Sequence, residues 1–548
     1  MFIRRLLLNN NKTQHVLLRG IILNTPGSNI CRNSSNSSSS NDVNLLQSFH
    51  DISRRILSKQ TSFGRQPKIE AWNNTNTSQI SAANLTSNLC RAYLSLPDTS
   101  VSQWREEDKD LKQQFLRGIV DDYAVRISDV STAIKSLQTQ STFTDKTVSR
   151  LRELCTPQYE HIFRYILHSA NDDLGVAFMV KLRHDILDAV YYMKFVQRGD
   201  DQSNDNMNKK VCTATLSTAK HFNKLQTLES CIHGILTSLF RPGVLNLRRI
   251  TYEETPAAVI EQIALKEKVH PLQSLNDLRT RLGPGRRCYA FFHPALPQKP
   301  LVFVHVSLLQ EMPKSMEDIQ AGSDRVIEGI DSEEDAGFAA FYSITNTERG
   351  LAGVDLGNHL IKSVVKQLKE ELPKLETFCT LSPIPKFNKW LQGKIAIQQS
   401  SHDTDTIFTE EEMQLLEELF GSAKPLDSFL KLLDTPKWHE DNATATLIKP
   451  ILLKLAAYYL TIDTHYGRPL CPVAKFHIRN GAEMFRLNYL ADTSSKGMRN
   501  SCGVMINYHY SLDEIESNHA CYEMERKISI RDGVSKWLNE KPDHIPFK

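Results

Sequence analysis

Apolar side chains recur at helical spacing through much of the first half of the chain. Between residues 88 and 240, Gly and Pro are sparse and the alternation typical of strands is absent. Each apolar face needs another apolar surface to cover it, so these segments are expected to pack on one another. The pattern predicts an all-helical bundle domain over residues 88–241. The faces comprise Leu111, Phe115, Ile119 and Tyr123, then Ile162, Ile166 and Phe178, then Leu182, Ile186, Val190 and Met193.

The pattern changes after Arg241-Pro242-Gly243. Segments 289–293 and 301–308 are rich in β-branched and aromatic residues and predict two strands joined by a short link. Segment 338–345 predicts a third strand, 353–372 a helix, and 377–381 a further strand. This order predicts a β-α-β unit within an α/β domain over residues 242–548.

The rest of the second half mixes both patterns. Helices are predicted at 410–420, 426–433 and 447–460. Asn480-Gly481 is a favoured two-residue hairpin turn, so the alternating segments 473–479 and 483–490 are predicted to be paired strands. The apolar run from Ile451 to Ile462 is too short to cross a bilayer and contains Lys454, so no membrane span is expected.

Composition narrows the class of protein. A chain of 548 residues is too long for one core, and 40% hydrophobic with 24% charged residues is typical of soluble globular proteins. The net charge of +3 gives no general argument for binding nucleic acid. The 10 cysteines form no C-x-x-C pair and have no histidines at zinc-finger spacing. We therefore expect no metal site and a reducing compartment.

The amino-terminal segment resembles a targeting sequence. Residues 1–41 contain five Arg and Lys residues, many Ser and no acidic residue, and they end in the low-complexity run NSSNSSSSN. This composition predicts a mitochondrial transit peptide and linker, and hence the mitochondrial matrix. A secretory signal is the alternative, although polar residues 9–14 interrupt its apolar core. The chain has no C-terminal Ser-Lys-Leu peroxisomal tripeptide, and residues 42–87 are expected to be a poorly ordered or partly helical lead-in.

A glycine-rich loop lies between the predicted strand 338–345 and the following helix. Its glycines permit tight turns, and several amide N–H groups would converge at the positive end of the helix dipole. Such a nest binds phosphate, so a nucleotide or coenzyme pyrophosphate is one interpretation. A glycine-rich turn with no ligand is the other, because the loop is neither G-x-G-x-x-G nor a Walker loop. The candidate binding residues are Ala352, Gly353, Val354, Asp355, Leu356, Gly357 and Asn358.

Four side chains are candidates for chemistry, each with a structural alternative. Ser382 follows a strand and could hydrogen-bond a substrate, or it could cap a helix. His477 could move a proton, or it could be a hydrogen-bonded structural histidine. Tyr510 could donate a hydrogen bond into the site, or it could simply pack in the core. Asp355 could orient the histidine or cap the helix that follows it.

These motifs together resemble the malonyl-CoA decarboxylase family. The matching segments are FYSITNTERGLAGVDLGNHLIKSVVKQL (341–368), LSPIPKFNKWL (381–391) and the long block from CPVAKFHIRNGAEMF to MINYHYSL (471–512). The resemblance implies a helical amino-terminal domain followed by a catalytic domain similar to the GNAT superfamily of N-acetyltransferases. It also implies that the glycine loop holds the coenzyme pyrophosphate. The family commonly has Glu where this chain has Asp355, so the carboxylate is kept but is one methylene shorter.

The resemblance also implies an activity and a site. Decarboxylation of malonyl-CoA to acetyl-CoA and CO₂ would use Ser382 and His477, with Tyr510 completing the polar wall. The thioester delocalises the charge left by CO₂, so no cofactor is expected. A homo-oligomer formed through the helical domain is implied as well. An acyl-CoA-dependent N-acetyltransferase shares the coenzyme loop and stays an alternative, as does a non-enzymatic helical assembly protein.

Overall fold

The computed structural model describes residues 45–57, 81–97, 111–138, 144–170, 173–199, 219–400, 407–422, 424–435, 437–538 and 544–546. These residues form two compact units. The first comprises residues up to 246 together with 291–301 and 346–356, and the second comprises 247–290, 302–345 and 357–548. The segment predicted to be a transit peptide and linker (1–41) lies outside the described residues.

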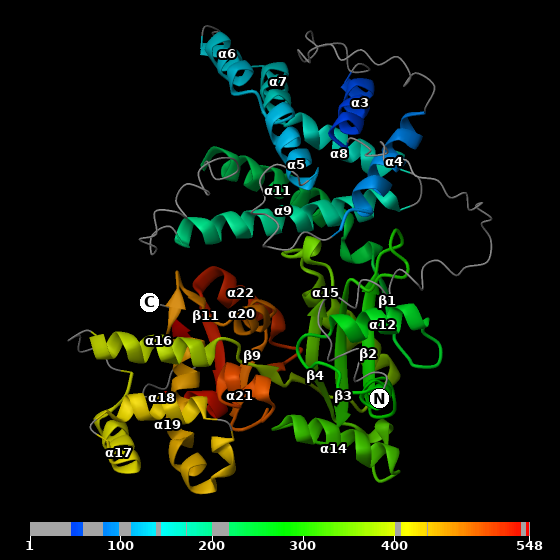
Figure 1. Ribbon diagram of the computed structural model, residues 1–548. Helices are drawn as coiled ribbons and strands as arrows, with labels where there is room; N and C mark the ends of the chain where they lie inside the picture. Colours follow the sequence, from blue (N-terminus) through cyan, green and yellow to red (C-terminus); the bar gives the residue numbers. More distant parts are fainter. Residues whose placement is uncertain are drawn as a thin grey trace, which may run out of the picture. The chain divides into compact units, whose positions relative to one another are not determined.

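Helices build the first unit (Figure 1). Phe49, Tyr93, Phe115 and Phe178 are buried and form a chain of edge-on and tilted aromatic contacts at the centre of this unit. The buried rings come from different helices, because each helix contributes one apolar face. The helices are α3 (Leu45–Leu57), α4 (Ala82–Leu94), α5 (Leu111–Asp122), α6 (Ile127–Gln138), α7 (Asp145–Cys155), α8 (Gln158–Ser169), α9 (Leu174–Gly199) and α11 (Ala219–Leu239).

Two short segments from the second half of the chain belong to the first unit. The 3₁₀ turn η6 (Arg349–Leu351) lies against α9, and Gly350 fits there because a Cβ at this position would collide with the Val180 carbonyl. Arg183 of α9 donates from Nη1 to the Gly350 carbonyl at 2.6 Å and from Nη2 to Glu229 of α11 at 2.7 Å. The segment before the glycine loop is therefore held by the helices.

A mixed sheet forms the centre of the second unit. Its strands follow the order β1-β2-β3-β4-β5-β10-β9-β11-β12, and β6 pairs with β10 beyond β5. The strands are β1 (Asn246–Arg249), β2 (Arg286–Phe292), β3 (Val302–Leu309), β4 (Phe338–Asn346), β5 (Thr377–Thr380), β6 (Ser382–Pro383), β9 (Glu483–Asn488), β10 (Met505–Tyr510), β11 (Lys527–Arg531) and β12 (His544–Pro546). A separate hairpin pairs β7 (Thr464–His465) with β8 (Arg468–Pro469).

The predicted β-α-β unit is confirmed. β4 and β5 run parallel, with Phe338 opposite Thr377, and α15 (Leu356–Glu371) connects them. The other helices are α12 (Ala257–Lys266), α13 (Leu275–Leu282), α14 (Met316–Ile327), α16 (Phe387–Ser400), α17 (Glu410–Phe420), α18 (Pro425–Asp434), α19 (Asn442–Thr461), α20 (Pro472–Arg479), α21 (Ser495–Ser501), α22 (Ile515–Glu525) and α23 (Asp532–Ser535). The predicted fold class, a helical region followed by an α/β domain, is therefore confirmed. The predicted domain boundaries stay a prediction.

The predicted hairpin around Asn480-Gly481 is wrong. Residues 472–479 form helix α20, with Pro472 in its first turn and Ala474, His477 and Ile478 buried at helical spacing. Gly481 has a φ of +82°, so the pair ends the helix and does not turn a hairpin. Helix α16, which follows the SPIP segment, was not predicted at all. Short segments such as 473–479 satisfy both periodicities, and only packing distinguishes them.

Helix α19 is the one helix of the described ranges that could span a bilayer by length and composition. Its residues Ile448, Leu452, Leu455 and Ala456 are buried inside the second unit. A buried core helix satisfies the same criteria of length and composition.

Candidate active site

The amino-terminal end of α15 lies against α20. A Cβ at Gly357 would come within 3.0 Å of the Phe476 ring, so the absence of a side chain lets the two helices approach closely. Gly353 has a φ of +83°, as the predicted glycine turn requires. Ala352 and Gly353 are exposed, whereas Asp355 and Asn358 are half-buried. Ala352 and Gly353 therefore leave backbone open to solvent shortly before α15 begins.

Ser382 lies in β6, where it faces Ile506 of the antiparallel strand β10. Its side chain is buried, and its Oγ donates to Thr380 Oγ1 at 2.8 Å. The same Oγ lies 3.2 Å from His477 Nε2. The next helix begins at Phe387, so Ser382 does not cap it. The two prolines after Ser382 restrict the backbone and help to fix this position.

His477 is held on every side of its ring. Nδ1 lies 2.8 Å from the Tyr510 hydroxyl, and Nε2 faces Ser382. The Tyr508 ring stacks on the imidazole with a centroid distance of 4.5 Å and an interplanar angle of 24°. The imidazole is 4% exposed, so both its position and its hydrogen bonds are fixed by the fold. Three of the predicted residues, Ser382, His477 and Tyr510, therefore form one continuous polar chain.

Burial determines the protonation states of His477 and Tyr510. Removal from water lowers the pKa of His477 from 6.5 to about 3, so the imidazole is neutral at physiological pH. Burial also raises the pKa of Tyr510 far above its usual value, while the Asn480 side chain acts in the opposite direction. Tyr510 thus keeps its proton. Since the Ser382 hydroxyl donates to Thr380, the consistent arrangement has Tyr510 donating to Nδ1 and Nε2–H donating to Ser382.

Three residues beside the site were not predicted from the sequence. Thr380 accepts from Ser382 and, at 3.2 Å, from the Tyr508 backbone N–H. It lies two residues before Ser382, and Tyr508 lies two residues before Tyr510, so the period of a strand could have indicated both. Asn480, at the end of α20, is buried beside the Tyr510 hydroxyl, and its side chain acts to lower the pKa of that hydroxyl. No sequence signal distinguished it from a turn residue.

Asp355 is the predicted residue that the structure does not join to this chain. It belongs to the first compact unit, whereas Ser382, His477 and Tyr510 belong to the second. It directly precedes α15, which is a capping position. A role for Asp355 in orienting the site stays a prediction.

Comparison with known proteins places these residues in a family. The model of the malonyl-CoA decarboxylase C-terminal domain matches residues 243–547, and that of the N-terminal domain matches residues 123–240. The mitochondrial malonyl-CoA decarboxylase of Anser anser anser is 34% identical over 393 residues, covering 71% of each chain. That of Mus musculus is 35% identical over 388 residues, covering 70% of this chain and 72% of the mouse protein.

Solved structures agree. The crystal structure of malonyl-CoA decarboxylase from Agrobacterium vitis aligns with a TM-score of 0.68 and 28% identity over 90% of this chain and all of that one. The enzyme from Rhodopseudomonas palustris aligns with a TM-score of 0.65 and 31% identity over 90% of this chain and 94% of that one. These matches show that the chain belongs to the malonyl-CoA decarboxylase family.

Proposed function

We propose that this chain converts malonyl-CoA to acetyl-CoA and CO₂ through a thioester enolate, without a metal or organic cofactor. The observation that carries the proposal is the 3.2 Å contact between Ser382 Oγ and His477 Nε2, both of which are buried side chains. Loss of CO₂ leaves an electron pair that the thioester carbonyl accepts. The protein then has to orient the malonyl group, stabilise the enolate oxygen and deliver one proton to the α-carbon.

The proton would come from a neutral imidazole. With Tyr510 donating to Nδ1, the Nε2 proton of His477 points at Ser382. We propose that, when substrate binds, the Ser382 hydroxyl turns from Thr380 to the malonyl carboxylate. After CO₂ leaves, Ser382 gives its proton to the α-carbon and takes up the Nε2 proton of His477.

The negative charge that develops on the imidazole is stabilised by the Tyr510 hydrogen bond. The proton is regained from solvent after acetyl-CoA leaves and water enters the emptied substrate site. The His477 pKa of about 3 describes loss of the imidazolium proton, so it makes the neutral imidazole the form that donates. The α-carbanion of a thioester is basic enough to take a proton from that neutral form.

The glycine loop would hold the coenzyme. We propose that the backbone amides of residues 352–358 bind the pyrophosphate of CoA at the start of α15. Gly357 places that helix start against Phe476, the residue next to His477. This proximity supports a path from the pyrophosphate to the acyl group. Asp355 would cap α15 or orient the site. A variant that lacks the carboxylate should lose stability in the first case and kcat in the second.

The test is release of CO₂ from malonyl-CoA by purified protein, with acetyl-CoA measured in parallel. Ser382→Ala is expected to lower kcat at least ~100-fold, since a residue in direct contact with the reacting group contributes several kcal/mol. His477→Gln is expected to have a similar effect. Ser307→Ala is the matched control, because Ser307 is also buried but has no hydrogen-bond partner among the described residues. Full kcat in Ser382→Ala would refute the Ser–His mechanism.

Addition of a primary amine to the same assay tests the acetyltransferase alternative. Decarboxylation without an acceptor, and no new amide from acetyl-CoA, is the expected result.

We further propose a mitochondrial matrix location and a homo-oligomer. The relatives from goose and mouse are named mitochondrial, and residues 1–41 carry bases without acids. Import of the full chain into isolated mitochondria, with shortening at the amino terminus, tests the location. Mass measurement of the purified protein in solution tests the oligomer.

A further inference from the structure

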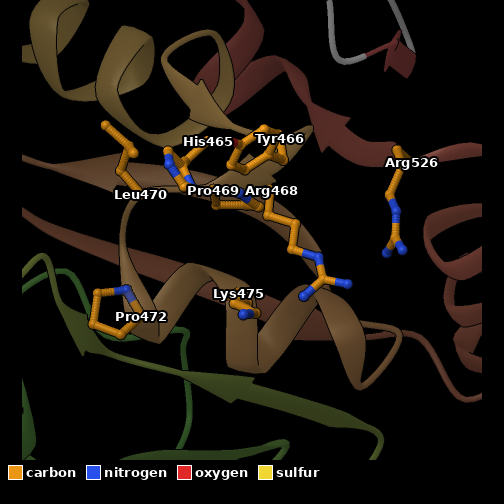
Figure 2. A pocket seen from close by; sticks show the side chains of 8 residues that line it. All are labelled: His465, Tyr466, Arg468, Pro469, Leu470, Pro472, Lys475 and Arg526. Atoms are coloured by element: carbon orange, nitrogen blue, oxygen red, sulfur yellow. The ribbon is translucent and has the colours of Figure 1, made fainter. Parts of the chain in front are cut away.

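A second site lies on the solvent side of α20, in the second unit. An open cavity of about 700 Å³ and a neighbouring one of about 420 Å³ share the lining residues Arg468, Lys475 and Arg526. The walls come from the β7–β8 hairpin, from α20 and from the end of α22 (Figure 2). The larger cavity is also lined by His465, Tyr466, Pro469, Leu470 and Pro472, and the smaller one by Arg479, His519, Tyr522 and Glu523.

The charged side chains that line the two cavities are mostly positive. Arg468, Lys475, Arg479 and Arg526 face the two cavities, and Glu523 is the one carboxylate that lines them. Glu523 lies 3.9 Å from Arg479 Nε and 3.6 Å from Arg526 Nη1. Arg468 and Lys475 have no ion-pair partner in the part of the chain that the structure describes. Like charges gathered around a cavity repel one another, and a bound anion removes that cost.

The aromatic ring of Tyr466 lies at the edge of the larger cavity. Tyr466 is 90% exposed and has a φ of +52°, and the following Gly467 has a φ of +65°. These values form the tight turn of the β7–β8 hairpin, with a tyrosine where Asn or Gly is usual. A bulky residue in the left-handed region is strained, and here its ring is not packed in a core. The exposed ring offers a flat surface on which a nucleobase can stack.

We propose that this basic pocket binds the phosphates of an adenine nucleotide whose base stacks on Tyr466. One guanidinium group can donate two parallel hydrogen bonds to the oxygens of a phosphate. Figure 2 shows the Arg468 side chain extending over the helix that carries Lys475. Two sources share this chemistry: the phosphoadenosine end of the coenzyme substrate, and a free nucleotide. Helix α20 favours the first source, because it exposes Lys475 here while it buries His477 in the candidate active site. That source rests on the proposed function.

The experiment uses the double variant Arg468→Gln/Lys475→Gln of the full chain. The control is Lys366→Gln/Lys431→Gln, which removes two exposed charges outside the pocket. Binding of adenosine 3′,5′-bisphosphate is measured by calorimetry. Decarboxylation is measured in parallel with malonyl-CoA and with its form lacking the 3′-phosphate. Loss of two charge-assisted contacts is expected to weaken bisphosphate binding at least ~10-fold in the pocket variant alone.

The results distinguish the coenzyme from a free nucleotide and can refute the proposal. If removal of the 3′-phosphate lowers kcat/KM in the wild type but not in the pocket variant, the pocket holds the coenzyme. If removal of the 3′-phosphate from malonyl-CoA leaves kcat/KM of the wild type unchanged, but the pocket variant loses bisphosphate binding, the pocket binds a free nucleotide. If bisphosphate binding and kcat/KM are the same in the wild type and both variants, the proposal is overturned. Binding does not require turnover, so a wild type that released no CO₂ would refute the proposed function and leave the pocket testable.

Discussion

His477 combines a neutral imidazole with two directed hydrogen bonds, and both properties follow from its surroundings. The ring lies between Tyr508, Tyr510 and Ser382, and water is excluded from it. Burial penalises the imidazolium form and lowers the pKa to about 3. The fold therefore holds an imidazole whose neutral state does not change across the physiological pH range.

The low pKa of His477 predicts a specific dependence of stability on pH. Between pH 6.5 and about 3 the unfolded chain binds a proton that the folded chain excludes, so stability present above pH 6.5 is lost as pH falls. At pH 5 this one group should account for a loss of about 2 kcal/mol. Urea unfolding at pH 7 and pH 5 checks this. His477→Gln should lose that much less than the wild type, and equal losses would show that His477 titrates normally.

Tyr510→Phe isolates the hydrogen bond to Nδ1. The ring stays in place, but the hydroxyl that lies 2.8 Å from Nδ1 is removed. We expect kcat for malonyl-CoA to fall about 10-fold with KM little changed, because one hydrogen bond that orients the imidazole is lost. Tyr342→Phe removes the hydroxyl of another buried tyrosine, which lies outside the Ser382–His477–Tyr510 hydrogen bonds, and should leave kcat unchanged. Equal kcat in the wild type and Tyr510→Phe would assign Tyr510 to packing alone.

Helices and strands bring these side chains together from distant parts of the sequence. Ser382 comes from β6, Tyr510 from β10 and His477 from α20, and the pairing of β6 with β10 fixes the first two. The end of α20 fixes the third. Gly481 has positive φ there, and a Cβ on it would collide with the Ile515 carbonyl at the start of α22.

Gly481→Ala is therefore expected to destabilise the protein by at least ~2 kcal/mol, through both the left-handed backbone and the steric clash. Gly393→Ala is the matched control. Gly393 lies inside α16 and a Cβ there meets no other atom within 4 Å, so alanine should be neutral or stabilise by about 0.5–1 kcal/mol. Denaturant unfolding of both variants measures the difference. A Gly481→Ala variant as stable as the wild type would contradict the helix end described for α20.

The elements also show where sequence patterns succeed. The strand–loop–helix–strand order around α15 was predictable, because its long amphipathic helix and its strands, rich in β-branched and aromatic residues, have distinct periods. Segment 473–479 was not, because seven residues with apolar positions at 474, 476 and 478 satisfy the strand period as well. The helix is chosen by Pro472 and by the burial of His477.

On the scale of the whole molecule, the two compact units do not follow the order of the sequence. Residues 346–356 lie far along the chain but belong with the helices of the first unit. Arg183 of α9, which is buried, is the central contact, because it binds both Gly350 and Glu229. Arg349 adds an ion pair to Asp188 of the same helix at 2.8 Å. The helical unit therefore positions the segment that leads into the proposed coenzyme loop.

Arg183→Lys tests this connection. Lysine keeps the charge but cannot bind Glu229 and the Gly350 carbonyl together, so the loop should be less well ordered. We expect KM for malonyl-CoA to rise about 10-fold while kcat changes little, since the loss is one or two hydrogen bonds away from the reacting atoms. Arg164→Lys, on an exposed pair with Glu160, is the control and should match the wild type. A fall in kcat at constant KM would argue against a role in coenzyme binding.

The sequence by itself determined the division into a helical and an α/β region, the β-α-β unit and the identity of Ser382, His477 and Tyr510 as candidates. Local periodicity and motif chemistry carry that information, because they depend on neighbouring residues. Only the tertiary structure decided that α20 is a helix, that Tyr508 and Thr380 complete the site, and that residues 346–356 belong with the first unit. These features depend on contacts between segments far apart in the chain, and on the burial that sets the pKa of His477.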